Sequence, residues 1–537
     1  MISIASRTSK NSWASGTDVA AAAGAGSKAN ASGGEEKADT AAWLAVLAGT
    51  LGALMATLDI SIVNSALPTI QGEIGASGTE GTWISSAYLI AEIIVIPLSG
   101  WLVRMLGLRT LLLGSTVLFT LFSIVCGTST SLVMMIVGRA GQGITGGVLI
   151  PTAQTIIAQR LPRSQQPIGT AMFGVTAIMG PVIGPVIGGW LAENISWHYA
   201  FFLNVPLCAG LVILLLLGLP HEKPQLGELA KADWLGIAGL AFGLGGLTVV
   251  LEEGQREQWF DSPMIQGMTV ITVAGFICLF AGQKLASRPV IKLSLLLDRQ
   301  FGSVAIMGVF VGVALYGTSY VIPQFLANVA GYNALQSGLV VMISGIPSLF
   351  MMAVIPILLA RLDIRLAVAS GLLLMGGSAL INAQLNIESV GHDFTAGQLM
   401  RGFGQILSFM FLSQAVVQSV PREDAGDASG LFNAMRNIGG SFALAAISIL
   451  QEKRLWLHER RLEESLSANS YDVQHYVNAN GGLTTAARQL EQQITGQAFV
   501  MTYNDIFWLM GVATLAVIPL VLFLRPLPKN VKPAAVH

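Results

Sequence analysis

Apolar runs of roughly 18 to 25 residues, the length at which an α-helix crosses a bilayer core, follow one another along most of the chain. Of its 537 residues, 53% are hydrophobic and 11% are charged, whereas about 25% are charged in a typical soluble protein. The sequence therefore predicts an all-α integral membrane protein with about fourteen transmembrane helices. The expected spans lie near residues 43–64, 82–103, 110–129, 132–156, 167–191, 200–219, 233–252, 264–283, 302–325, 335–359, 366–385, 395–419, 429–450 and 504–524.

The distribution of Lys and Arg predicts the orientation in the membrane. An even number of spans puts both termini on one side, and the loops of that side carry most of the cations, including Arg104, Arg109 and Arg365. By the positive-inside rule this side is the cytoplasm. We expect residues 1–40, rich in Ala, Gly and Ser, to form a disordered cytoplasmic tail, and residues 526–537 to form a second tail.

Several classes of function are disfavoured by composition. The formal net charge of −1 provides no basic surface for nucleic acid. Cys126, Cys208 and Cys278 lie in different apolar runs without metal-ligand spacing. We therefore expect neither a cofactor nor a metal site.

One glycine pattern imitates a nucleotide-binding loop. Gly141, Gly143 and Gly146 have the G-x-G-x-x-G spacing of a dinucleotide fingerprint. They lie inside an expected membrane helix, where small residues allow a neighbouring backbone to approach and irregular lipid-exposed backbone is excluded. We interpret them as packing residues.

Two opposite charges lie at a similar expected depth in the membrane. Arg139 is about seven residues from the outer end of the fourth span, or ~10 Å deep, and Asp59 is about five residues from the outer end of the first. Charges inside a membrane usually face a partner or a cavity. They form either a switchable pair, broken by substrate or by a proton on the carboxylate, or a fixed pair that holds the helices together.

Glu92 is the most isolated acid of the chain and is expected near the membrane midplane. Burial favours the neutral form of a carboxyl group, as a proton-exchange site requires. The alternative is a neutral Glu that only hydrogen-bonds neighbouring backbone.

The fifth span is unusually rich in Pro and Gly. Prolines remove backbone donors and bend a helix, while glycines allow close packing, so this span is expected to form a tight, kinked contact that closes one side of a path. These packing residues are Gly180, Pro181, Gly184, Pro185, Gly188 and Gly189.

A weak internal repeat predicts two six-helix bundles, residues 41–220 and 302–525, separated by two inserted helices within 233–283. Residues 97–109 resemble residues 356–365, and Gly138–Gln142 resembles Met400–Gln405. The second bundle includes a long outer loop, 451–503, whose charged runs 451–464 and 486–494 are typical of amphipathic helices.

These motifs together resemble the fourteen-helix drug:proton antiporters of the major facilitator superfamily, in particular EmrB-type multidrug efflux pumps. The similarity extends from about Trp43 to Arg525. Leu58–Pro68 resembles the family's first-helix motif, Arg139–Gly143 its fourth-helix motif and Gly180–Gly189 its fifth-helix antiporter motif. In the loop after the second span, four residues match or replace positions of the gating motif: Gly100, Arg104, Gly107 and Arg109.

The resemblance implies a major facilitator fold and proton-driven export of hydrophobic or amphipathic drugs across the bacterial inner membrane, with coupling through Asp59, Glu92 and Arg139. It also implies a periplasmic adaptor (EmrA-like) and an outer-membrane channel (TolC-like), for which the outer loop is the candidate docking surface. Arg104 stands where the gating motif has Asp, so the family's charge relay need not operate in that form. An exporter of one metabolite, such as a fatty acid or siderophore, a membrane enzyme and a non-transporting sensor are the alternatives.

Overall fold

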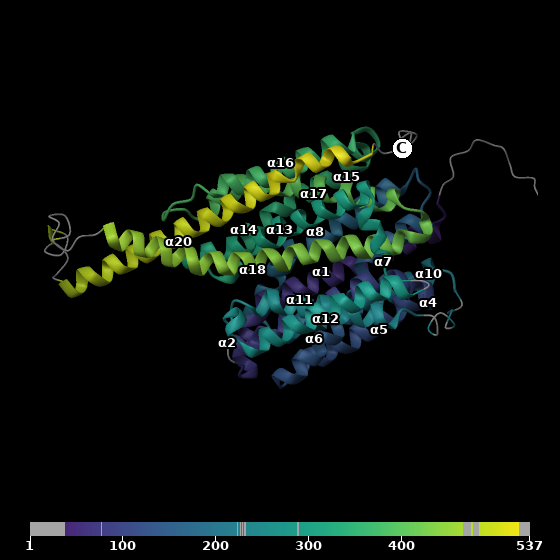
Figure 1. Ribbon diagram of the computed structural model, residues 1–537, viewed down its shortest axis with the longest axis horizontal. Coiled ribbons are helices and arrows are strands. Elements are labelled where there is room, and N and C mark those ends of the chain that lie inside the picture. The colour runs from purple at the N-terminus through teal and green to yellow at the C-terminus, as the bar shows by residue number, and fades with distance from the viewer. Residues whose placement is uncertain are drawn as a thin grey trace, which may run out of the picture. The chain divides into compact units, whose positions relative to one another are not determined.

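A computed structural model describes residues 38–76, 78–222, 224–225, 227, 229, 232–286, 289–465, 474–475 and 483–525. Within these residues the secondary structure is entirely helical (Figure 1). Most of the predicted tails, 1–37 and 526–537, lies outside the described residues, as does the middle of the predicted outer loop.

The segment before the predicted insertion forms one set of helices. They are α1 (Thr40–Ile74), α2 (Gly78–Gly81), α3 (Trp83–Val95), η1 (Ile96–Leu98), α4 (Ser99–Leu106), α5 (Leu108–Gly127), α6 (Leu132–Gly146), α7 (Leu149–Arg160), α8 (Gln166–Asn194), α9 (His198–Phe202) and α10 (Asn204–Gly218).

The insertion and the segment after it are helical too. The inserted pair is α11 (Trp234–Glu253) and α12 (Pro263–Leu285), connected through η3 (Trp259–Asp261). The later elements are η4 (Leu293–Leu297), α13 (Arg299–Asn328), α14 (Ala334–Met342), η5 (Ile343–Gly345), α15 (Ile346–Arg361), α16 (Ile364–Asn382), η6 (Gly391–Phe394), α17 (Thr395–Ser419), η7 (Arg422–Asp424), α18 (Ala425–Ser465), α20 (Leu483–Ala516) and η8 (Ile518–Phe523).

Every expected span overlaps a helix or a run of consecutive helices. Among the described residues, 11 helices are long and apolar enough by themselves to cross a membrane. The expected spans that do not reach this threshold coincide with α14–α15, α17 and α18. α17 and α18 carry buried polar side chains, such as Arg401 and Asn433, which neighbouring helices cover.

Local sequence signals set several helix ends. Asp39 caps α1 by accepting a hydrogen bond from the backbone N–H of Ala42, and Gly75 ends the helix with a φ of 73°. Ser131 caps α6 in the same way. Such residues satisfy the free N–H and C=O groups at helix ends.

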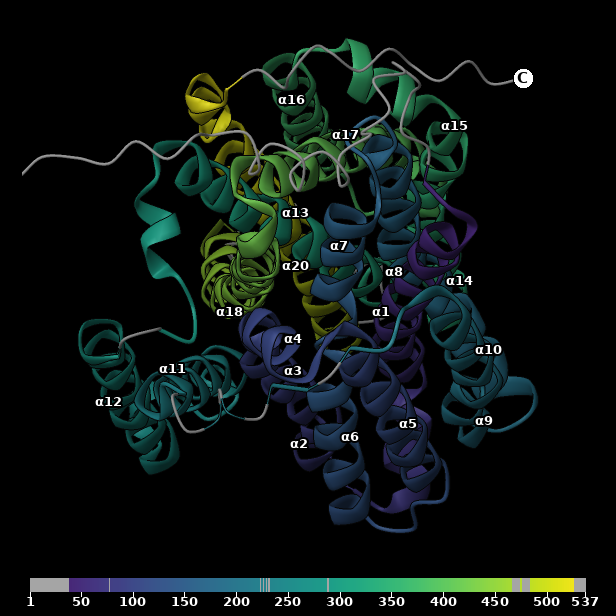
Figure 2. The ribbon, with the colours of Figure 1, turned by 90° about the vertical axis from the view of Figure 1, so that its right-hand side faces the viewer.

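The inserted helices pack against each other through glycines. A Cβ on Gly275 of α12 would lie 2.2 Å from the backbone N of Gly243 on α11, so the two backbones are in contact. α11 also contacts α3 and α18. Figure 2 shows α11 lying between α12 and α3. The insertion therefore brings one helix against both flanking segments.

The predicted outer loop is helical over its described ends. Residues 451–465 continue α18 and residues 483–503 begin α20, so these runs are extensions of the two long helices (Figure 1). The extensions are held together where Asp505 accepts from His458 Nε2 at 2.9 Å and pairs with Arg454 at 3.4 Å. The prediction of helical charged runs is confirmed for these residues.

Candidate functional site

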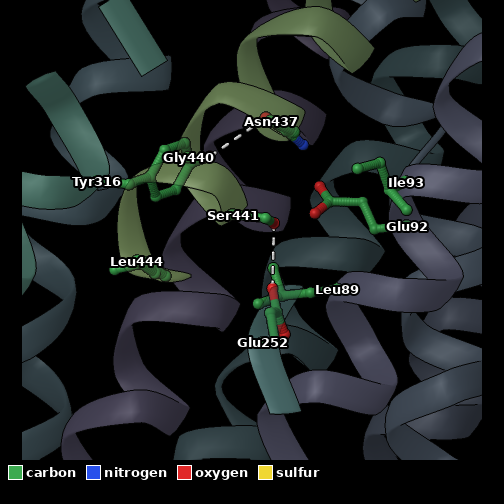
Figure 3. Close-up of a pocket in the computed structure, with 9 residues that line it drawn as sticks. All are labelled: Leu89, Glu92, Ile93, Glu252, Tyr316, Asn437, Gly440, Ser441 and Leu444. Carbon is green, nitrogen blue, oxygen red and sulfur yellow. Dashed lines mark hydrogen bonds between the residues drawn. The ribbon is translucent and has the colours of Figure 1, made fainter. Parts of the chain in front are cut away.

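A cavity lies where α3, α11, α13 and α18 meet (Figure 3). Its volume is about 30 Å³, which is room for one or two water molecules. Glu92 projects into it from α3, and the residue is 2% exposed. Among the described residues, Glu92 Oε1 has no hydrogen-bond partner. The alternative of a Glu that simply hydrogen-bonds backbone is therefore not supported for this oxygen.

A second carboxylate, Glu252 of α11, faces the same cavity. Its Oε1 accepts a hydrogen bond from Ser441 Oγ of α18 at 3.2 Å. Glu252 was not predicted as a site residue from sequence, because it lies at the end of an apolar run, where a charged residue usually marks the membrane surface. The adjacent Glu253 differs, since it accepts from Ser86 at 2.9 Å and pairs with Arg256 at 2.5 Å.

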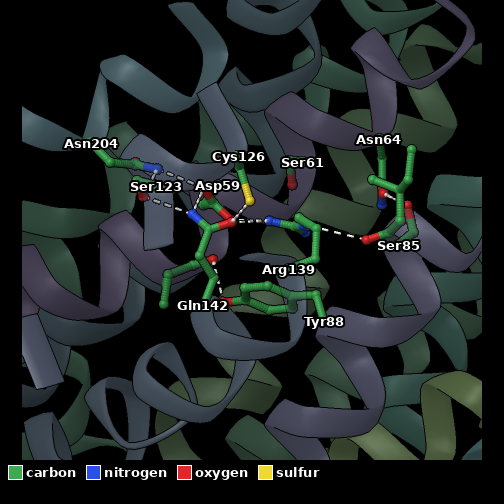
Figure 4. Close-up of polar contacts among 12 residues, drawn as sticks. Asp59, Ser61, Asn64, Ser85, Tyr88, Ser123, Cys126, Arg139, Gln142 and Asn204 are labelled. Atoms are coloured by element: carbon green, nitrogen blue, oxygen red, sulfur yellow. Dashed lines mark hydrogen bonds and ion pairs between the residues drawn. The ribbon is translucent and has the colours of Figure 1, made fainter. Parts of the chain in front are cut away.

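Asp59 of α1 and Arg139 of α6 form a buried ion pair (Figure 4). Arg139 Nη1 lies 2.6 Å from Asp59 Oδ2, and both side chains are 0% exposed. The predicted meeting of these two residues is confirmed. A buried pair of this kind needs further hydrogen bonds to offset the loss of water around both charges.

Two neutral amide side chains supply those hydrogen bonds to Asp59, and both also donate to a neighbouring serine. Gln142 and Asn204 both donate to Asp59 Oδ1, at 3.1 and 2.6 Å. The same two amides donate to Ser123 Oγ at 2.7 and 3.1 Å. Among the described residues Asp59 thus accepts three side-chain hydrogen bonds, one from Arg139 and one from each of the two amides.

Arg139 is held on its other sides by α3. Its Nε donates to the Ile84 carbonyl at 3.1 Å, and its guanidinium lies over the Tyr88 ring at 4.3 Å. Cation–π contact of this kind stabilises a desolvated guanidinium. Arg139 Nη2 has no hydrogen-bond partner among the described residues. Tyr88 is one helical turn from Glu92, so α3 connects the ion pair with the cavity.

The glycines of α6 act as packing residues, as predicted. A Cβ on Gly143 would lie 2.3 Å from the Tyr88 carbonyl O, and one on Gly141 would lie 2.4 Å from the Phe122 ring. Gly146 faces the Tyr88 hydroxyl at 2.8 Å. The G-x-G-x-x-G spacing therefore reflects close contact of α6 with α3 and α5.

The Gly-rich face of α8 packs against α1. Cβ atoms on Gly180, Gly184 and Gly188 would come within 2.1–2.3 Å of Thr57, Ser61 and Ser65. Gly189 is different, because its nearest neighbour is Leu335 at 3.8 Å. Pro181 and Pro185 lie inside the helix, and Pro185 is 3.3 Å from a Cβ on Gly338 of α14.

The residues of the loop motif lie at the opposite end of the helices from α2. Arg104 Nη1 pairs with Asp427 Oδ1 of α18 at 2.7 Å. Gly100 allows this approach, because its Cβ would lie 2.1 Å from the same oxygen. Gly107 has a φ of 78° and ends α4, while Arg109 donates to the Leu219 carbonyl at 2.9 Å.

Near the end of the helices that carries the loop motif, further polar contacts join the segment before the insertion to the segment after it. Gln154 of α7 donates to Ser413 at 3.3 Å and accepts from Asn433 at 3.2 Å. Thr170 of α8 donates to Gln414 of α17 at 2.7 Å. In this conformation the helices before and after the insertion are thus bound to each other by buried hydrogen bonds.

Arg401, which corresponds to Arg139 in the internal repeat, has a different environment. Arg401 is buried, with 3% of the residue exposed. It donates to Ser344 at 2.8 Å and Ser319 at 3.4 Å. The described residues provide no carboxylate within ion-pairing distance of it.

Comparison with known proteins identifies what the chain resembles. The family profile described as Major Facilitator Superfamily matches residues 49–444. Colistin resistance protein EmrB of Acinetobacter baumannii is 32% identical over 483 residues, 88% of this chain and 94% of that protein. Multidrug export protein EmrB of Escherichia coli K12 is 32% identical over 488 residues, 89% of this chain and 94% of that protein.

The fold is similar to a solved transporter structure. The human organic anion transporter MFSD10 (TETRAN) aligns with a TM-score of 0.55, covering 88% of this chain and 99% of that one at 16% identity. At this identity the likeness concerns the fold alone.

Proposed function

Since this chain belongs to the major facilitator superfamily of membrane transporters, we propose that it exports hydrophobic or amphipathic drugs and toxic compounds across a bacterial inner membrane in exchange for protons. Its similarity to EmrB proteins along nearly the full length of both chains makes it an EmrB-like exporter. Proton coupling, the breadth of substrates and cytoplasmic placement of both termini are the finer parts of the proposal.

The proposal of proton coupling rests on the environment of Glu92. Its Oε1 is buried, faces a cavity and lacks a hydrogen-bond partner among the described residues. A carboxyl group in such a place can bind and release a proton without first breaking an ion pair. In the proposed cycle Glu92 binds a proton from the outer side and releases it to the cytoplasm while substrate moves outward.

Asp59 and Arg139 form the second part of the proposed coupling system. Their pair joins α1 to α6, and the Tyr88 ring joins the pair to α3. Because the Tyr88 carbonyl abuts Gly143 of α6, a shift of α3 on protonation of Glu92 must also move α6. The charge state of Glu92 can thereby alter the surroundings of the ion pair.

The free energy released by one proton moving inward is sufficient to concentrate the substrate many-fold on the outer side. One elementary charge moving inward gives about 2.3 kcal/mol per 100 mV, which corresponds to roughly 50-fold accumulation of substrate before any pH gradient is counted. Alternating access then requires the polar contacts around Arg104, Gln154 and Thr170 to open in the inward-facing state.

The extensions of α18 and α20 provide the proposed docking surface for an EmrA-like adaptor, which would connect to a TolC-like channel. The α18 extension carries exposed charged side chains, such as Arg460 and Glu464. Charge reversal at both positions is expected to reduce co-purification of the adaptor without changing flux in liposomes that lack it.

The export proposal is tested in proteoliposomes. Efflux of an amphipathic dye is measured under an imposed pH gradient for wild type, Glu92→Gln and the control Glu388→Gln, whose carboxylate is exposed. We expect gradient-dependent efflux in wild type and control, and its loss in Glu92→Gln. Undiminished gradient-dependent efflux in Glu92→Gln would remove Glu92 from the mechanism.

A further inference from the structure

One end of the inserted helix α11 is bound to helices of both flanking segments. This end carries Glu252 and Glu253 and is the outer end in the proposed orientation. On one side it meets α3 of the segment before the insertion, and on the other it meets α18 of the segment after it. Nearer the loop motif α18 contacts the earlier segment directly, since a Cβ on Gly430 would lie 2.8 Å from the Ile96 carbonyl O.

The contact of α11 with α3 is long and closely packed. A Cβ on Gly245 would lie 2.9 Å from a side chain of α3, so the helices touch about two turns before Glu253. At the end of α11, Glu253 accepts a hydrogen bond from Ser86 Oγ of α3 at 2.9 Å. Arg256 pairs with Glu253 at 2.5 Å and also donates to Thr82 Oγ1, next to α3. α11 is thus fixed to α3 by helix packing as well as by polar contacts.

The contact of α11 with α18 is shorter and less closely packed. Ser441 Oγ of α18 donates to Glu252 Oε1 at 3.2 Å (Figure 3). Gln255 Nε2, just beyond α11, donates to Glu452 Oε2 in the α18 extension, at the exposed surface where water competes for both groups. Ser441 and Glu252 also line the cavity of about 30 Å³, so packing between the helices is incomplete there. Separating α11 from α18 therefore breaks fewer close contacts than separating it from α3.

The turn that follows α11 is held in one shape against that helix. Gln258 and Trp259 have φ angles of 56° and 53°, in the left-handed region that residues other than glycine seldom adopt. Trp259 Nε1 donates to Gln255 Oε1 at 2.8 Å, and a Cβ on Gly254 would lie 2.6 Å from the Trp259 ring. Because α12 packs on α11 backbone to backbone, the two helices and their turn form one stiff unit.

We propose that the inserted pair moves together with the segment before it, and that the outer side opens by separation of α11 from α18. The hydrogen bonds Ser441–Glu252 and Gln255–Glu452 are then an outer latch, which closes the path on this side and is released in each transport cycle. This inference rests on the proposed export function and adds the line along which the outer side parts. It also gives the insertion a role, because α18 closes against α11 as well as against α3.

Distances between spin labels test the latch in the purified full-length protein in nanodiscs. The three native cysteines are first replaced by Ala. Labels are then attached to cysteines introduced at three exposed positions, Asp261 in the insertion, Gly72 on α1 and Lys453 on α18. Double electron–electron resonance gives the insertion–α18 distance and the insertion–α1 distance.

The latch variant combines Ser441→Ala with Gln255→Ala. We expect the population with a lengthened insertion–α18 distance to rise about tenfold, since two hydrogen bonds of the closed state are lost, while the insertion–α1 distance stays the same. The matched control combines Ser86→Ala with Thr82→Ala and removes hydrogen bonds to α3 instead. Neither distance should lengthen in the control, because helix packing keeps α11 on α3.

Three results with the latch variant would overturn the inference. They are a longer insertion–α1 distance with an unchanged insertion–α18 distance, a lengthening of both distances, and a lengthening of neither.

Reversible cross-linking gives a second measurement that leaves the buried residues unchanged. A short bifunctional methanethiosulfonate that joins Gln255→Cys to Glu452→Cys should abolish efflux from proteoliposomes until a reductant is added. The same reagent across Thr82→Cys and Arg256→Cys should leave efflux within about twofold. Undiminished efflux with the first link in place would also overturn the latch.

The label distances are measured without a gradient, so their outcome does not depend on transport. Separation of α11 from α18 in a protein that shows no gradient-driven efflux would retain the latch and reject proton-driven export. Gradient-driven efflux by a protein whose α11 stays on α18 would do the reverse.

Discussion

Arg104 of α4 and Asp427 in the first turn of α18 form an ion pair, 2.7 Å between Nη1 and Oδ1, that connects the segments before and after the insertion. The carboxylate is buried, while the arginine is 41% exposed. Arg104 occupies the position at which the related loop motif has an acid, so the charge on α4 is inverted and an acid on α18 complements it.

Charge reversal at this pair is expected to change transport. Arg104→Asp places two acids together and should reduce the efflux rate several-fold, since like charges in contact repel. Adding Asp427→Arg should restore part of the rate. Recovery will be incomplete because a cation at a helix N-terminus is unfavourable.

The measurement is a double-mutant cycle on efflux rates in proteoliposomes. Gly100→Ala provides a second variant, because its Cβ would displace Asp427 without altering any charge. Additive effects of the two charge reversals would show that the contact has no part in the transport cycle.

Removing one member of the Asp59–Arg139 pair should destabilise the protein. Asp59→Asn leaves Arg139 buried without a counter-charge, a change that costs about 3–5 kcal/mol when a buried pair is broken. The double variant Asp59→Asn with Arg139→Gln should lose less than the sum of the single changes. Thermal unfolding of purified variants checks this, and single variants as stable as wild type would contradict it.

Gly143 is expected to tolerate no side chain. Gly143→Ala places a Cβ 2.3 Å from the Tyr88 carbonyl and should cost about 1–3 kcal/mol through forced separation of α6 from α3. Gly114 of α5 has nothing within 4 Å of its Cβ position, so Gly114→Ala should be neutral or slightly stabilising. Equal melting temperatures for the two variants would show that the helices separate easily.

The glycines of α8 give a matched test of gating. Gly184→Ala would bring its Cβ 2.3 Å from that of Ser61 on α1, whereas Gly189→Ala meets nothing closer than 3.8 Å. We expect the first to reduce efflux strongly and the second to leave it near the wild-type rate. An equal loss of efflux in both variants would indicate that the substitutions disturb the folding of α8 in general and not its contact with α1.

Helix positions were predictable from sequence because a membrane span depends on the length and apolarity of one continuous segment. The buried charges were predictable for a related reason: Asp59, Glu92 and Arg139 interrupt apolar runs, and their distance from the span ends gives their depth. The meeting of Asp59 with Arg139 followed from equal depth. Gln142 and Asn204, which donate to Asp59, and Ser123, which accepts from both, were not predicted to be part of this site, because single polar residues in a span carry no signal of their own.

The sequence by itself therefore determined the membrane class, the spans and the charges that had to be buried, since each depends on local chemistry. Only the tertiary structure decided which of those groups share a site. Glu252 and Glu253 are adjacent acids at the end of one helix, and the packing of α11 against α3 and α18 directs the first into the cavity and the second to Arg256. Side-chain environments of this kind depend on helices distant in sequence, because burial and counter-charge are supplied by neighbours rather than by the segment that carries the residue.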